Sequence, residues 1–198
     1  PSPHMPLRHT LTTIAIVMAA TLPLQAQQAD KEQLGRAIEY FQTAKYHECM
    51  LILARLDSVY TINPRFRAFL GVCYYYESQY TKAAEYLEAT IPQLKAFSPQ
   101  EVGLYNWLCG ECLFKQEQWQ RAIAYYEATT LMRHGNEKAD ALYRLGFCYI
   151  NLHNMRVAKD YLESALIYYE RAGSPDYKAR VAQLRNMTAA LRNYLGEE

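Results

Sequence analysis

Small residues recur in this chain as pairs whose members are 12 residues apart. The four pairs are Ala37 with Cys49, Gly71 with Ala83, Gly110 with Ala122, and Gly146 with Ala158. The first members of successive pairs are separated by 34, 39 and 36 residues. Two antiparallel helices approach closely only where a small residue faces the partner helix. The spacing therefore predicts four helix pairs, which must stack because a single pair cannot bury its apolar face.

Large residues flank the second small residue of each pair. Three positions before it lie Tyr46, Tyr80, Trp119 and Met155, and four positions after it lie Leu53, Leu87, Tyr126 and Leu162. This arrangement resembles the tetratricopeptide repeat, whose pattern is W-x2-L-G-x2-Y followed by A-x3-F and a Pro. The fourth copy matches best, through Leu145, Gly146, Tyr149, Ala158 and Leu162. The first copy is degraded, since Cys49 replaces the second Ala, and the whole match covers about 31–171.

The resemblance implies an all-α, right-handed solenoid of an exported bacterial type, with repeats at about 31–63, 64–98, 99–135 and 136–172. We expect helices at about 31–44, 46–60, 65–78, 80–95, 100–116, 118–132, 137–152, 154–171 and 176–195. Pro92 lies inside the fourth of these helices. Proline removes a backbone donor and clashes with the preceding turn, so this helix should end or kink near Ile91.

The last predicted helix fits no repeat. Its apolar residues Val181, Leu184, Leu191 and Leu195 share one face, and Lys178, Arg185 and Arg192 recur every seven residues on another. We interpret the segment 175–196 as the capping helix that ends such an array. The alternative is a basic surface that binds an acidic partner or a lipid.

Residues 1–26 have the layout of a leader that contains a signal peptide. A basic Arg8 precedes an uncharged stretch from Leu11 to Leu24, and the small Ala26 follows. We expect cleavage after Ala26 and a mature helical repeat domain at 27–198. A buried N-terminal helix is the alternative. The stretch of 14 residues is shorter than the ~20 that a membrane span needs, so we expect a periplasmic or secreted protein without a stable span.

The charge balance argues against a nucleic-acid partner. The full chain has 21 basic and 20 acidic residues, and loss of Arg8 with the leader leaves 20 against 20. A protein that binds nucleic acid normally carries a basic excess, which neutralises phosphates. We therefore expect a protein or peptide partner, and its identity and the oligomeric state remain open at this point.

The cysteines favour packing over chemistry. Cys73, Cys112 and Cys148 each follow the repeat glycine by two positions, and Cys49 stands in the other small column. We expect these four to be buried and reduced, because adjacent helices lie about 8–10 Å apart and a disulfide needs Cα atoms within ~7 Å. The pair Cys109 and Cys112 forms C-x-x-C inside a helix, so a thiol redox role is the less favoured alternative. No spacing suggests a catalytic, metal or cofactor site, and we expect a protein that is not an enzyme.

In each pair, the first helix should line the inside of the curved array. Residues near the repeat glycine would then face a groove rich in aromatic side chains, which are enriched at binding hot spots. The predicted partner-binding residues are Tyr75, Tyr76, Trp107, Glu111, Phe114, Lys115, Tyr143 and Phe147. Alternatively, some of these side chains pack against the next repeat or the last helix. Two functions follow: an interaction scaffold that binds a peptide or protein segment in this groove, or an assembly component of a cell-envelope complex that uses its outer surface and last helix.

Overall fold

The computed structural model describes residues 28–197, which form helices and short connections and contain no strand. The chain divides into two compact units, one ending at Thr61 and the other beginning at Ile62. The leader expected at 1–26 lies outside the described residues. Within the described part, no helix is both long enough and apolar enough to span a membrane.

The described part of the first unit, residues 28–61, contains one helix pair. A helix over 28–42 is followed by α2 (Tyr46–Val59). The small residues Ala37 and Cys49 are both fully buried, as expected for a column where two helices approach. Asp30 accepts hydrogen bonds from the Tyr60 hydroxyl and the Arg55 guanidinium, each at 2.6 Å, which ties the start of the first helix to the end of α2.

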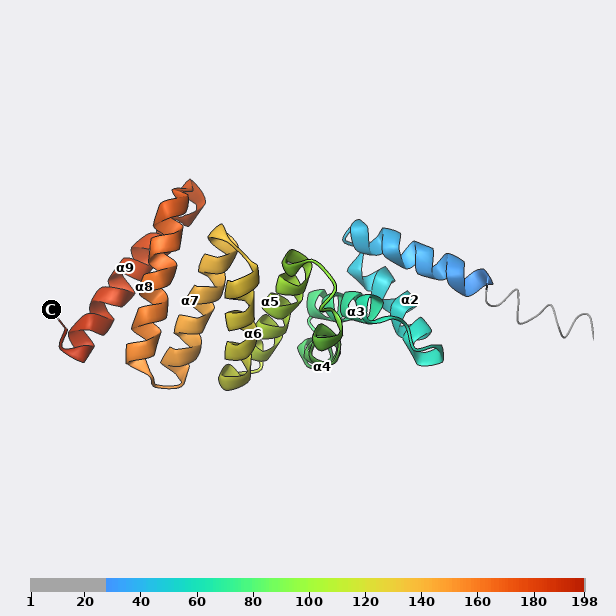
Figure 1. Ribbon diagram of the computed structural model, residues 1–198, viewed down its shortest axis with the longest axis horizontal. Coiled ribbons are helices and arrows are strands. Elements are labelled where there is room, and N and C mark those ends of the chain that lie inside the picture. Colours follow the sequence, from blue (N-terminus) through green and yellow to red (C-terminus); the bar gives the residue numbers. More distant parts are fainter. Residues whose placement is uncertain (1–27, 198) are drawn as a thin grey trace, which may run out of the picture. The chain divides into compact units, whose positions relative to one another are not determined.

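The second unit contains the remaining helices, each of which packs on the next one along the chain (Figure 1). They are α3 (Pro64–Tyr76), α4 (Tyr80–Thr90) with the 3-10 turn η1 (Ile91–Gln93), α5 (Pro99–Lys115), α6 (Trp119–Met132), α7 (Gly135–Asn151), α8 (Met155–Ala172), the turn η2 (Pro175–Tyr177) and α9 (Lys178–Leu195). The all-α prediction is confirmed. The expected break at Pro92 is also confirmed, because α4 ends at Thr90 instead of continuing to 95.

The repeat glycines of the second unit lie where the two helices of a pair approach most closely. A Cβ atom on Gly71 would lie 2.9 Å from Leu87 Cγ, one on Gly110 would lie 2.8 Å from Tyr126 Cε1, and one on Gly146 would lie 2.5 Å from Leu162 Cγ. Each partner is the large residue that the sequence places four positions after the second small residue. The two helices can therefore pack at this separation only because the glycine has no side chain.

The connection inside each pair has one recurring backbone geometry. Ala44, Ser78, Glu117 and His153 all have φ between +57° and +60°. In each case the next residue donates a backbone hydrogen bond to the residue five positions before it, for example Gln118 N to Leu113 O at 2.9 Å. This is the Schellman ending of a helix, which normally favours glycine at the left-handed position. Here four non-glycine residues adopt it at the same place in the repeat.

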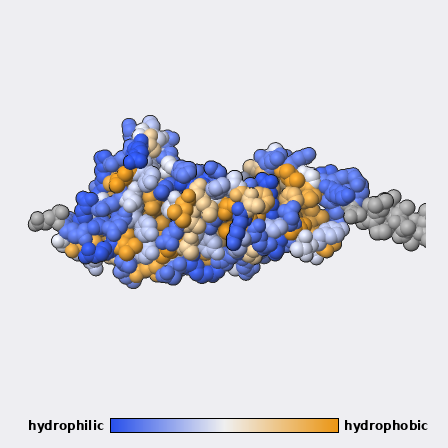
Figure 2. Space-filling model, viewed as in Figure 1, coloured by the Kyte–Doolittle hydropathy of each residue, from blue (hydrophilic) through white to orange (hydrophobic). Residues whose placement is uncertain are grey.

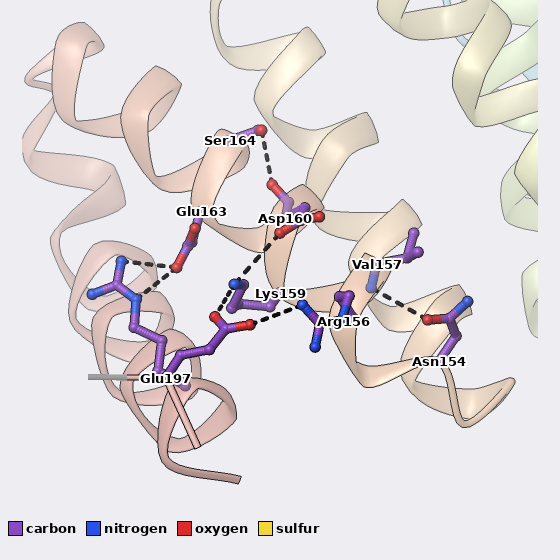
Figure 3. Close-up of polar contacts among 9 residues, drawn as sticks. Asn154, Arg156, Val157, Lys159, Asp160, Glu163, Ser164 and Glu197 are labelled. Carbon is purple, nitrogen blue, oxygen red and sulfur yellow. Dashed lines mark hydrogen bonds and ion pairs between the residues drawn. The ribbon is translucent and has the colours of Figure 1, made fainter. Parts of the chain in front are cut away.

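The last helix is fastened to α8 by apolar contacts and ion pairs. Leu184 is fully buried. Arg185 binds Glu170 at 2.7 Å and Arg192 binds Glu163 at 2.8 Å. Two of the three bases that could have formed a free basic surface are thus paired with α8, which favours the capping role. Near the end of α9, Glu197 lies between Lys159 and Arg156 and pairs with both (Figure 3).

We predict that Gly146→Ala destabilises the protein by about 1–3 kcal/mol, because the new Cβ would overlap Leu162 inside the pair of α7 and α8. The matched control is Gly35→Ala, in the helix over 28–42, where a Cβ meets no atom within 4 Å. That change should stabilise by about 0.5–1 kcal/mol through helix propensity. Urea unfolding followed by circular dichroism measures both, and equal effects of the same sign would contradict the packing argument.

Candidate functional site

The first helices of successive pairs are joined by arginine–carboxylate contacts. Arg65 on α3 binds Glu101 on α5 at 2.8 Å, and Arg144 on α7 binds Glu111 on α5 at 2.6 Å. Arg180 on α9 reaches Asp140 on α7 at 3.6 Å. We call the surface formed by α3, α5, α7 and α9 the first-helix face. All predicted partner-binding residues belong to its helices.

Tyr75 and Tyr76 form an aromatic cluster at the end of α3. Their rings are 5.3 Å apart, and Tyr75 also lies 5.8 Å from the ring of Tyr80. Burial raises the pKa of Tyr75 to about 12, whereas Tyr76 is 51% exposed. The ammonium of Lys115, on α5, lies 5.2 Å from the Tyr80 ring. Lys115 and Tyr76 are exposed, and the ring of Tyr75 packs against that of Tyr76.

Glu111 lies inside the protein, with 4% of its surface exposed. Its carboxylate accepts hydrogen bonds from the Tyr126 hydroxyl at 2.7 Å and from the Arg144 guanidinium at 2.8 Å. The same guanidinium lies 4.7 Å from the ring of Phe114. A buried carboxylate is tolerated only when it is paired and hydrogen-bonded, as it is here. Glu111 thus holds α5, α6 and α7 together and does not present its charge to solvent.

Trp107 forms one wall of a pocket. Its ring is 5.5 Å from the buried ring of Tyr126, and the remainder of the side chain is partly exposed. The pocket has a volume of about 230 Å³ and is lined by Leu104, Trp107, Thr129, Arg133, Glu137 and Asp140. The sequence identified Trp107 alone among these, because the spacing rule selects positions close to the repeat glycine. Leu104 comes from the first turns of α5. Thr129 and Arg133 come from the end of α6, and Glu137 and Asp140 come from the start of α7.

Tyr143 and Phe147 lie together on α7, with ring centres 4.7 Å apart. Tyr143 is only 9% exposed, because α9 covers it. The Arg180 guanidinium lies 4.3 Å from the Tyr143 ring, and the Tyr143 hydroxyl contacts Gln183 at 3.4 Å. Tyr143 therefore follows the alternative expected from the sequence, in which the side chain packs against the last helix. Phe147 remains partly exposed.

A second concavity lies beside the connection between η1 and α5. It has a volume of about 580 Å³ and is lined by Ile91, Pro92, Lys95, Phe97, Pro99, Val102, Asn106, Ala128, Leu131 and Met132. Leu131 is 82% exposed and Ile167, which occupies the same position in the next repeat, is 57% exposed. Apolar side chains also reach the surface among hydrophilic ones over the visible side of the molecule (Figure 2).

The five cysteines are all buried as thiols, which confirms the expectation for Cys49, Cys73, Cys112 and Cys148. Burial raises the pKa of Cys112 and Cys148 to about 12, and it raises the pKa of Cys109 further. Thiolate is the reactive form, so these groups are unsuited to redox exchange at neutral pH. No group of three or more His, Cys, Asp or Glu in the described residues could hold a metal ion.

We predict that the folded protein reacts slowly with a disulfide reagent at pH 8 and that all five thiols react once it is unfolded. The physical reason is that burial suppresses the thiolate and blocks access. The rate of colour release with and without denaturant measures this. Rapid reaction of Cys109 or Cys112 in the folded protein, or a disulfide between them in peptide mapping, would revive the redox alternative.

The stacked helix pairs define a helical-repeat protein. A family model for the tetratricopeptide repeat matches residues 140–172, which span most of α7 and all of α8. None of the curated protein sequences matches the chain significantly. Residues 140–172 thus match the tetratricopeptide repeat, and the solved structures described next share the fold of the longer helical array.

Several solved structures share the fold. A MamA mutant aligns with a TM-score of 0.64 at 15% identity, covering 84% of this chain and 83% of that chain. The apo form of RapI aligns with a TM-score of 0.61 at 13% identity, covering 85% and 64%. The C-terminal part of a repeat-containing protein of this family from Cytophaga hutchinsonii gives 0.57 at 18% identity, covering 81% and 64%. At these identities the likeness concerns the fold alone.

Proposed function

We propose that this protein is a non-enzymatic scaffold that binds a peptide or protein segment along the first-helix face. The observation that carries the proposal is the pocket beside Trp107, where an indole ring meets polar groups in a space of about 230 Å³. A pocket that combines an aromatic wall with a few polar groups is the usual form of a binding hot spot. Phe147 and the exposed Tyr76 extend aromatic surface along the neighbouring first helices.

The support is uneven over the eight residues selected from the sequence. Six retain exposed surface, namely Tyr75, Tyr76, Trp107, Phe114, Lys115 and Phe147, whereas Glu111 and Tyr143 are held by Arg144 and Arg180. A partner segment would therefore contact the first group directly. The second group would act by keeping the helices in position.

We predict that Trp107→Ala weakens capture of the partner from a cell-envelope extract by about 2 kcal/mol or more, since aromatic anchors dominate binding energy. Trp107 also packs on Tyr126, so the melting temperature is measured in parallel. Leu104→Ala, at a side chain that is 38% exposed, removes pocket wall at a smaller cost in stability. If either variant had a lower melting temperature but captured the partner as well as the unchanged protein does, the proposed groove would be wrong.

The alternative is an assembly component of an envelope complex that uses the outer surface. It is favoured by the apolar concavity around Leu131. Leu131→Asp discriminates the two functions, because the side chain is 82% exposed and its replacement should leave the fold intact. Capture that is lost with Leu131→Asp and kept with Leu104→Ala supports assembly through the outer surface, and the reverse supports the scaffold.

We also propose that the chain is exported, on the strength of Arg8 and the uncharged stretch up to Leu24. Mature protein isolated from its host should begin near Gln27 and be found in the periplasmic or secreted fraction. Intact-mass measurement checks this. Full-length protein that keeps the apolar stretch in the cytosolic fraction would contradict the proposal.

A further inference from the structure

Two guanidinium groups on the first-helix face are held in the same way. Arg144 lies 4.7 Å from the Phe114 ring and pairs with Glu111 at 2.6 Å. Arg180 lies 4.3 Å from the Tyr143 ring and reaches Asp140 at 3.6 Å. In each case a cation rests on an aromatic ring within the ~6 Å range of a cation–π contact and has a carboxylate beside it.

Trp107 occupies the position of Tyr143 one repeat earlier, since each lies three residues before the repeat glycine. Tyr143 is covered by Arg180 of the last helix, α9. The corresponding base of α7, Arg144, is committed to Glu111 and Phe114. The indole of Trp107 instead borders the pocket. The aromatic ring at this position of the repeat can therefore be reached by a group from outside the protein.

The charges around the pocket favour a cation. Its lining contains the carboxylates of Glu137 and Asp140 and one base, Arg133. Arg133 is directed at the Gln100 carbonyl, at 2.6 Å, and pairs with Glu137. Lys138, the neighbouring base on α7, lies over the Tyr168 ring and does not line the pocket.

Asp140 retains capacity to accept a further donor. Its carboxylate accepts a hydrogen bond from the Tyr169 hydroxyl, and its contact with Arg180 is long, at 3.6 Å. The Asp140 side chain is 34% exposed. A carboxylate has about four lone-pair positions, so these contacts do not saturate it.

We propose that the pocket beside Trp107 accepts an arginine or lysine side chain of the partner segment. The cation lies on the indole ring, and Asp140 and Glu137 provide the negative charge. This inference rests on the proposed function, because the side chain belongs to the segment that the first-helix face binds. It assigns a chemical class to the partner: a segment with a basic residue at the position that meets α5 and α7.

The test uses short peptides and requires no knowledge of the partner. The probe is N-acetyl-Gly-Arg-Gly-amide, and the matched control replaces arginine by citrulline, which has nearly the same shape without the charge. The readout is the indole N–H signal of Trp107 in ¹H–¹⁵N spectra of the full chain. The chain has two tryptophans, and Trp119 serves as the internal reference. We expect a saturable shift of the Trp107 signal with the arginine and lysine peptides, and little shift with citrulline.

Substitutions in the pocket complete the test. Asp140→Asn keeps an acceptor for Tyr169 while removing the charge, and Glu137→Gln changes a side chain that is 56% exposed. Each should weaken binding of the arginine peptide about fivefold, as expected for a partly exposed ion pair. Glu85→Gln, at an exposed position on α4, is the control and should have no effect. Unchanged folding is verified by thermal melting.

Equal shifts with arginine and citrulline, or a larger shift with a glutamate peptide, would overturn the proposal. These results leave the proposed function standing if Trp107→Ala still abolishes capture of the partner. Conversely, charge-selective binding of the arginine peptide with unaltered capture by Trp107→Ala would support the cation pocket and overturn the scaffold function.

Discussion

The close approach of two helices at the repeat glycines is the constraint on which the second unit depends. At Gly71, Gly110 and Gly146, the large residue of the partner helix fills the space that a Cβ atom would need. The contact sets the separation of the two helices within each pair, and it fixes the side from which the flanking side chains emerge. Each pair therefore presents its first helix to the neighbouring pairs in a similar way. The first-helix face thus depends on the glycine contacts, which lie beneath it.

The first-helix face joins successive helix pairs, and it is also the face that we propose binds a partner. Contacts of Arg65 with Glu101, Arg144 with Glu111, and Arg180 with Asp140 join successive first helices. Exposed pairs of this kind contribute little stability, but a buried one such as Glu111 with Arg144 fixes how neighbouring helices are aligned, because a misaligned carboxylate would be left without a partner. In the proposed function, a partner contacts the positions that these interactions leave accessible, above all Trp107.

The irregular features of the repeat create the second concavity. The spacing of 39 residues from Gly71 to Gly110 exceeds the spacings of 34 and 36 on either side, and Pro92 ends α4 early at Thr90. The extra residues form η1 and the connection to Pro99, and these border the apolar concavity near Leu131. An insertion between two helix pairs is tolerated because it does not alter the glycine contacts within either pair. The surface around this connection thus gains a shape that the regular repeat lacks.

The amino-acid sequence alone determined the helix pairs, the packing columns and the position of Pro92, because these depend on residue size and backbone chemistry at fixed spacing. It also selected Trp107 and the buried cysteines. It did not reveal the left-handed turns at Ser78 and Glu117, because those residues carry no glycine signal and the surrounding packing imposes the geometry. Only the tertiary structure decided which candidate binding residues stay accessible. Glu111 is neutralised by Arg144, 33 residues away, and Tyr143 is covered by Arg180, 37 residues away. Local spacing specifies which face of its own helix a side chain occupies, whereas burial depends on what the next helix places opposite it.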